Sequence, residues 1–121
     1  MKESIDEVVR AAAALPLYDA AYKLWTSRRE YLKLGGAAIP GGKIFEILQA
    51  AHPEVSDAAL KAAIQSAADF EIACTSSFKY TDGGNLGRDA DWAIALARVT
   101  YPQFQENTYR LASFALALAM R

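Results

Sequence analysis

Histidine and cysteine are the residue types best suited to nucleophilic catalysis, and the chain holds one of each, His52 and Cys74. A Cys–His nucleophile needs a third group that orients the base, and no motif identifies one. His52 precedes Pro53 and fits the C-terminal end of a helix, where positive charge is favourable. With one residue of each type, the sequence excludes zinc sites built from several His and Cys ligands.

Three aspartates near the middle of the chain, Asp82, Asp89 and Asp91, are candidate ligands for a cation. The ligand spacing of an EF-hand is absent, and the segment from Asp82 to Asn85 is typical of a turn. We therefore expect no bound metal, no cofactor and no small-molecule substrate. On these grounds we predict that the chain is not an enzyme.

A glycine-rich segment over residues 35–43 resembles a phosphate-binding loop only superficially. In the motif G-x-x-x-x-G-K-[ST], a start at Gly36 would require lysine at position 42, which is glycine. Lys43 is followed by Ile44, so the hydroxyl that would hold magnesium is also missing. An ordinary connection between helices explains the segment better.

Cations alternate with aromatic residues over residues 18–33. At 100° per residue, Trp25 falls on the apolar face, while Tyr22 falls on a flank together with cations. Charge and stacking on such a flank suit a nucleic-acid backbone, although a solvated basic face is the simpler alternative. The predicted nucleic-acid contacts are Lys23, Arg29, Lys33 and Lys43.

Two charged residues lie where the helical pattern expects apolar ones. Arg28 projects into the apolar face of its helix, and Glu71 lies near the centre of another apolar face. Because a buried unpaired charge costs several kcal/mol, we predict that Arg28 and Glu71 form a structural ion pair. The alternative is that both faces bind a partner.

The segment from Leu111 to Met120 is apolar around nearly its whole circumference. Leu111 and Leu118 can serve the chain's own core, whereas Phe114 and Leu116 are predicted to point elsewhere. A terminal helix of this kind is either packed between other helices or covered by a partner. Phe114 and Leu116 are therefore the predicted partner interface.

Helix signals predict an all-α fold with five to six helices in a compact bundle. Ser4 and Glu7 match a capping box, Pro16 separates two helices, and Gly35 ends the second. We expect helices over residues 5–15, 17–34, 43–51, 57–74, 89–101 and 102–120, with 89–101 central. The segment between the end of the 57–74 helix and residue 88 is expected to be coil. The alternative is a strand over residues 70–80 that closes a short hairpin around 75–88. No internal repeat is apparent beyond a richness in alanine.

Length and composition indicate a single helical domain over residues 1–121. The chain is 53% apolar and 22% charged, with a net charge of −1, as expected for a folded protein. A single cysteine and an acidic N-terminus favour the cytoplasm over a secreted protein. The longest apolar run is about half a membrane span, so we expect no membrane insertion.

These features favour a non-enzymatic subunit that binds a protein partner or itself, and that contacts nucleic acid through its basic face. In size and helical character the chain is similar to the small subunits of CRISPR ribonucleoprotein complexes, and equally to helical phage-encoded inhibitors. The first resemblance implies nucleic-acid backbone near Arg29, Lys33 and Lys43, and contacts between copies. The second implies a protein partner.

A helix-turn-helix regulator of DNA is a further alternative, formed by residues 43–51 and 57–74 with Val55, Leu60 and Ile64 inside. The only charged residues at the start of the would-be recognition helix are Asp57 and Lys61. Contacts to bases and phosphates need several polar or basic side chains, so this helix is poorly suited to DNA recognition.

Overall fold

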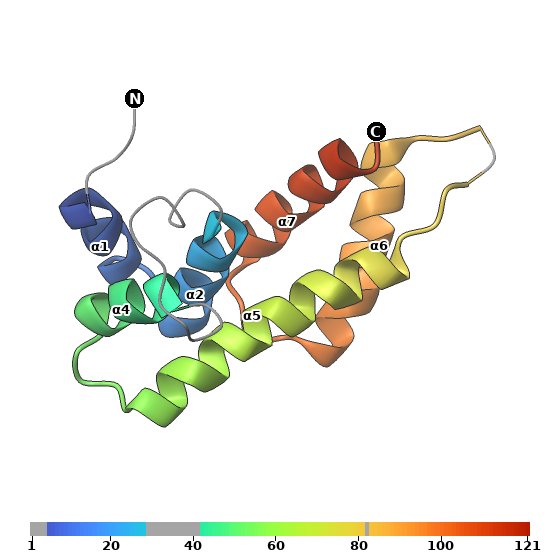
Figure 1. The fold of residues 1–121 in the computed structure, drawn as a ribbon. Helices are drawn as coiled ribbons and strands as arrows, with labels where there is room; N and C mark the ends of the chain where they lie inside the picture. The colour runs from blue at the N-terminus through green and yellow to red at the C-terminus, as the bar shows by residue number, and fades with distance from the viewer. Residues whose placement is uncertain (1–4, 29–41, 82) are drawn as a thin grey trace. The chain divides into compact units, whose positions relative to one another are not determined.

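The computed structural model describes residues 5–28, 42–81 and 83–121 of the chain, and those residues form helices and connections without a strand. The all-α prediction is confirmed (Figure 1). The six helices in the described residues are α1 (Ile5–Ala13), α2 (Leu17–Thr26), α4 (Gly42–Ala51), α5 (Asp57–Ser77), α6 (Leu86–Thr100) and α7 (Glu106–Ala119).

The chain divides into two compact units within α5. Unit 1 is residues 1–68 and unit 2 is residues 69–121. Each unit has buried residues of its own, and each is described by itself below. That the two form a single domain stays a prediction.

Unit 1 has an aliphatic core. Helix α4 packs against α1 and α2, and the start of α5 adds to the same cluster. The largest fully buried aliphatic side chains there are Leu24, Ile44, Leu48 and Leu60. Burying each of them stabilises the fold by about 1.5–3 kcal/mol, so this core accounts for much of the stability of unit 1.

Unit 2 combines small residues with an aromatic cluster. Helices α6 and α7 pack together, and they bury alanines at positions 90, 93, 97 and 112. The Phe70 ring lies 4.8 Å from the Phe104 ring and 5.7 Å from the Tyr109 ring, between centroids. Alanines allow close approach of helices, and the three rings fill the end where α6 joins α7.

The short hairpin considered around residues 75–88 is absent from the described part of that region. Helix α5 continues to Ser77, three residues beyond the predicted Cys74, and residues 78–81 and 83–85 form a connection. The Asn85 side chain accepts a hydrogen bond from the Arg88 amide at 3.0 Å, so α6 begins at Leu86. The N-cap Asn85 thus starts α6 three residues before Asp89, the start predicted from the sequence.

Helix α2 ends at Thr26, so the prediction of one helix from 17 to 34 is wrong. The Thr26 hydroxyl donates to the Lys23 carbonyl at 3.0 Å, and the Ser27 amide bonds to the Leu24 carbonyl at 3.2 Å. Hydroxyl side chains compete for backbone groups and favour helix ends, a signal that the apolar periodicity hides.

Candidate partner interface

His52 is held in unit 1 by structural contacts. Its Nε2 lies 3.2 Å from the Ala12 carbonyl oxygen, and its Nδ1 lies 3.7 Å from a carboxylate oxygen of the exposed Glu54. The ring therefore ties the end of α4 to α1. This is the helix-end role that the sequence favoured.

Cys74 is buried in unit 2. Burial, together with the nearby charge of Glu71, raises the pKa of the Cys74 thiol from 9.0 to about 12. The thiol is thus protonated near neutral pH, and a protonated thiol is a poor nucleophile. His52 and Cys74 belong to different units.

The aspartates considered as metal ligands serve as hydrogen-bond acceptors. Asp89 accepts from the Thr81 amide at 3.2 Å and from the Thr81 hydroxyl at 2.8 Å, while Asp91 accepts from the Ser113 hydroxyl. Asp82 lies outside the described residues. The described part of the chain contains no group of three or more His, Cys, Asp or Glu residues that could hold a metal ion.

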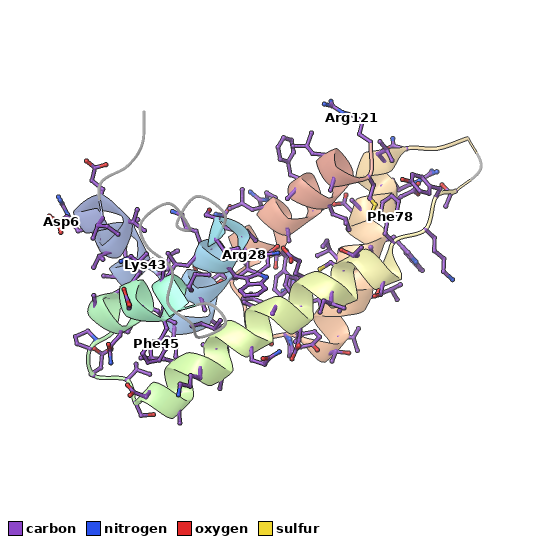
Figure 2. The ribbon with its side chains drawn as sticks, in the orientation of Figure 1. Asp6, Arg28, Lys43, Phe45, Phe78 and Arg121 are labelled. Carbon is purple, nitrogen blue, oxygen red and sulfur yellow. The ribbon has the colours of Figure 1, made fainter. Side chains whose placement is uncertain are left out.

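The predicted nucleic-acid contacts are only partly described. Lys23 is exposed on α2. Lys43, labelled in Figure 2, lies on α4, and its ammonium lies 3.2 Å from the Glu46 carboxylate. Arg29 and Lys33 lie outside the described residues. A basic face formed by the four residues stays a prediction.

Arg28 packs against Trp25, near the C-terminal end of α2. Its guanidinium carbon lies 4.2 Å from the centroid of the Trp25 ring, and Nη1 donates to the Trp25 carbonyl at 2.9 Å. Glu71 is half-buried on α5 in unit 2. The Arg28–Glu71 pair therefore stays a prediction, and Arg28→Met with Glu71→Gln would test it through the melting temperature.

The helix-turn-helix alternative begins its two helices within one residue of the starts of α4 and α5, but α5 ends at Ser77 and not at residue 74. Leu60 and Ile64 are buried in the core of unit 1, as that alternative required. Asp57 accepts a hydrogen bond from Gln49 at 3.1 Å, and the Lys61 ammonium lies 5.9 Å from the centroid of the Phe45 ring. The two charged groups at the start of α5 thus contact α4.

The two predicted interface residues of α7, Phe114 and Leu116, lie on different faces of the helix. Phe114 is 67% exposed, in agreement with the prediction, but Leu116 is 7% exposed and belongs to the buried face of α7. The reason is helical geometry, because Leu116 follows the buried Ala112 by four residues and so lies on the same side. The assignment of Leu116 to an outward surface is therefore wrong, and so is the expectation that Leu111 and Leu118 serve the core, because they are 59% and 48% exposed.

Large apolar side chains form an exposed stripe on α6 and another on α7, both in unit 2. The α6 stripe is Trp92, Leu96 and Val99, and the α7 stripe is Leu111, Phe114 and Leu118. Spacings of three and four residues place each set on one helix face. Each stripe thus lies away from the buried face of its own helix. That face is rich in alanine on α6, whereas on α7 it consists of Thr108, Tyr109, Ala112, Ser113 and Leu116.

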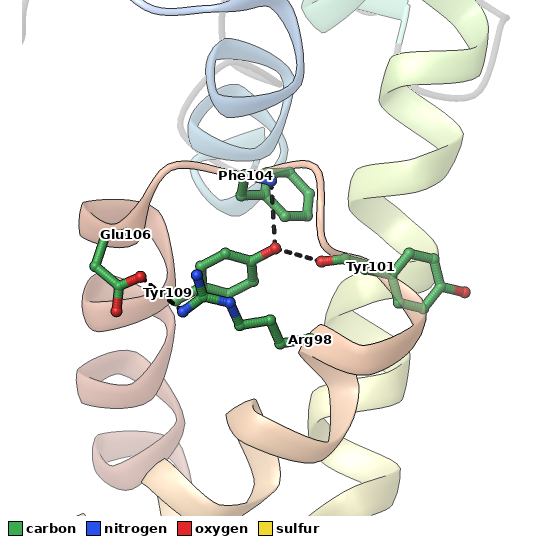
Figure 3. Close-up of polar contacts among 5 residues, drawn as sticks. All are labelled: Arg98, Tyr101, Phe104, Glu106 and Tyr109. Carbon is green, nitrogen blue, oxygen red and sulfur yellow. Dashed lines mark hydrogen bonds and ion pairs between the residues drawn. The ribbon is translucent and has the colours of Figure 1, made fainter.

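The connection between α6 and α7 is fixed by Tyr109, as Figure 3 shows. The Tyr109 hydroxyl donates to the Tyr101 carbonyl and accepts from the Phe104 amide at 3.3 Å. Beside it, Arg98 stacks on the Tyr109 ring at 4.2 Å and pairs with Glu106 at 2.7 Å. These contacts position α7 on α6, and therefore position both stripes.

The α6 stripe was missed because residues 89–101 were expected to be central and covered on all sides. The spacing of Trp92, Leu96 and Val99 was visible in the sequence, and so were the alanines on the other face. A helix that has alanines on one side and large apolar residues on the other packs closely through its alanines. That asymmetry is the signal for an outward apolar face.

Comparisons with protein-family models, curated proteins and solved structures give no match to this chain. In the described part of the chain, no helix combines the length and the apolar character needed to cross a membrane.

Proposed function

We propose that the chain is a non-enzymatic interaction subunit that binds a protein partner through the exposed faces of α6 and α7. The observation that carries the proposal is the exposure of six large apolar residues on α6 and α7, on the sides of these helices that lie away from their buried residues. Exposed apolar residues scattered singly are ordinary, whereas aligned stripes are typical of binding surfaces.

The energy available at these stripes is large enough for specific binding. An aromatic side chain buries about 150–250 Å² when it is fully covered. Trp92 and Phe114 are each about two-thirds exposed, so covering them yields roughly 2–4 kcal/mol apiece. Tryptophan and other aromatic residues are enriched among the residues that dominate interface energies.

The experiment compares proteins captured from the producing cells by the wild-type chain and by a double-serine variant, Trp92→Ser with Phe114→Ser. Serine has nearly the helix propensity of tryptophan and phenylalanine, so the helices are retained. Ile72→Ser, at a position of α5 that is 63% exposed and lies outside both stripes, is the matched control. We expect a partner that the wild type and control retain and the variant loses. Identical protein sets for all three chains would contradict the proposal.

Contact with nucleic acid is a separate part of the proposal and rests on the exposure of Lys23. If the chain is a small subunit of a nucleoprotein complex, the purified protein carries nucleic acid, and Lys23→Glu with Arg29→Glu removes it. Absorbance at nucleic-acid and protein wavelengths, with light scattering after gel filtration, measures both outcomes. A clean monomer free of nucleic acid would leave the protein-partner proposal and exclude this part.

A further inference from the structure

Helices α6 and α7 contain a repeated segment that alanine richness conceals in the full sequence. Residues 88–99 read RDADWAIALARV, and residues 110–121 read RLASFALALAMR. An arginine is followed after one helical turn by an aromatic residue and after another turn by leucine in both segments. Arg88, Trp92 and Leu96 thus correspond to Arg110, Phe114 and Leu118.

The apolar residues that correspond in the two segments have nearly equal exposure, although Asp89 is buried where its equivalent Leu111 is exposed. Trp92 and Phe114 are 64% and 67% exposed, and Leu96 and Leu118 are 46% and 48% exposed. On the inward faces, Ile94 corresponds to Leu116, and both are buried. The likeness therefore extends from residue type to position in the fold.

The two segments also meet at corresponding residues. Asp91 and Ser113 are equivalent in the repeat, and they are hydrogen-bonded to each other. Arg98 pairs with Glu106, so residue numbers rise along α6 while they fall along α7. The helices are antiparallel, and the Asp91–Ser113 contact lies where a local two-fold axis would pass.

Each stripe begins with an arginine that has no acidic partner in the described part of the chain. Arg88 and Arg110 are exposed, one turn before Trp92 and Phe114. The acids of the two helices are engaged elsewhere, because Asp89 accepts from Thr81, Asp91 from Ser113, and Glu106 pairs with Arg98. Beside each stripe there is thus an exposed arginine without an acidic partner among the described residues.

We infer that α6 and α7 are two equivalent docking sites for an acidic amphipathic helix, so that one chain binds two copies of the same element. This inference rests on the proposed function and names its partner. A partner helix with apolar residues one turn apart would cover Trp92 and Leu96, or Phe114 and Leu118. A carboxylate one turn further along would pair with Arg88 or Arg110.

A second copy of the chain fits the stripes less well. Parallel pairing of α6 with α7 of another copy would place Arg88 against Arg110. Antiparallel pairing of two α7 helices would place Arg110 near Arg121, which is also exposed. Pairing of two α6 helices leaves Arg88 beside Thr100. None of these arrangements supplies an acid to the arginines, and two of them set like charges together.

The test is a calorimetric titration of the full chain with two synthetic helical peptides. Both carry leucines one turn apart, and they differ in having glutamate or lysine one turn beyond the leucines. We expect two equal sites for the glutamate peptide and at least about tenfold weaker binding of the lysine peptide, which corresponds to about 1.4 kcal/mol. Arg88→Glu and Arg110→Glu should each reduce the stoichiometry from two to one.

Several results would overturn the inference. Among them are equal affinity for both peptides, no binding of the glutamate peptide, and a dimer in light scattering that the double-serine variant dissociates. Tighter binding of a single-stranded oligouridylate than of the glutamate peptide would equally replace it with nucleic-acid binding. If capture of a partner still depends on Trp92 and Phe114 while the glutamate peptide fails, only the acidic helix is wrong. If both experiments fail, the exposed faces of α6 and α7 are not a binding surface.

Discussion

The two units place their large apolar residues differently. In the described part of unit 1, leucine and isoleucine supply the large buried side chains, beside buried alanines, and the large apolar residues Ile5 and Tyr18 are only just over a third exposed. In unit 2, alanines and one aromatic cluster form much of the inside, while Trp92 and Phe114 face outward. The units thus show that apolar content alone does not decide burial. The face of the helix on which a residue lies decides it.

The largest expected effect contrasts two phenylalanines of unit 2. Phe70 is fully buried among Tyr101, Phe104 and Tyr109, so Phe70→Ala should lower the free energy of unfolding by about 3–5 kcal/mol. Phe114→Ala should change it by about 0.5 kcal/mol or less, because Phe114 is exposed. Urea unfolding followed by circular dichroism measures both. Similar decreases in the free energy of unfolding for both variants would show that Phe114 is as much a part of the core of unit 2 as Phe70.

The next contrast is between leucines of the two units. Leu48 is completely buried on α4, so Leu48→Ala should lower the free energy of unfolding by about 2–5 kcal/mol. Leu118→Ala removes a half-exposed side chain of α7 and should lower it by less than about 1 kcal/mol. The same unfolding experiment compares them. A greater loss at Leu118 would mean that the α7 stripe is part of the chain's own core.

A smaller effect is expected at the connection between α6 and α7. Tyr109→Phe removes the hydroxyl that bonds to the Tyr101 carbonyl and the Phe104 amide, and should lower the free energy of unfolding by about 1–3 kcal/mol. Tyr18→Phe, at an exposed position of unit 1, is the control and should have almost no effect. An unchanged free energy for Tyr109→Phe would show that this hydroxyl does not stabilise the turn.

The smallest effect is expected from the ion pair between Arg98 and Glu106. Both side chains are largely exposed, so Glu106→Gln should lower the free energy of unfolding by about 0–1 kcal/mol, and less at high salt. Unfolding at low and high ionic strength provides the measurement. A salt-independent loss well above 1 kcal/mol would give this pair a larger part in positioning α7 than its exposure indicates.

Helix periodicity predicted much of the fold but few of the helix ends. The bounds of α4 were found to within one residue, because Pro53 and the glycines before Lys43 are strong local signals. The ends of α2 and α5 and the start of α6 were missed, since they depend on individual hydrogen bonds of Thr26 and Asn85 and on packing along α5. Periodicity carries no information about such contacts.

The candidate interface was only half predicted, for a related reason. Phe114 was identified because α7 is apolar around its circumference, but that same uniformity put Leu116 on the wrong side. Trp92 was overlooked because α6 was expected to be covered by its neighbours. Which face of an apolar helix stays exposed depends on where the alanines allow close packing, and the α6–α7 contact itself reveals this.

The central claim is that Trp92 and Phe114 serve a partner and contribute little to the chain's own fold. The most direct measurement is the free energy of unfolding of the double-serine variant beside the wild type. The account predicts values within about 1 kcal/mol of each other, with the helical signal unchanged. A loss of more than about 3 kcal/mol, the cost of truncating a buried aromatic residue, would show that the stripes belong to the core and would contradict the account.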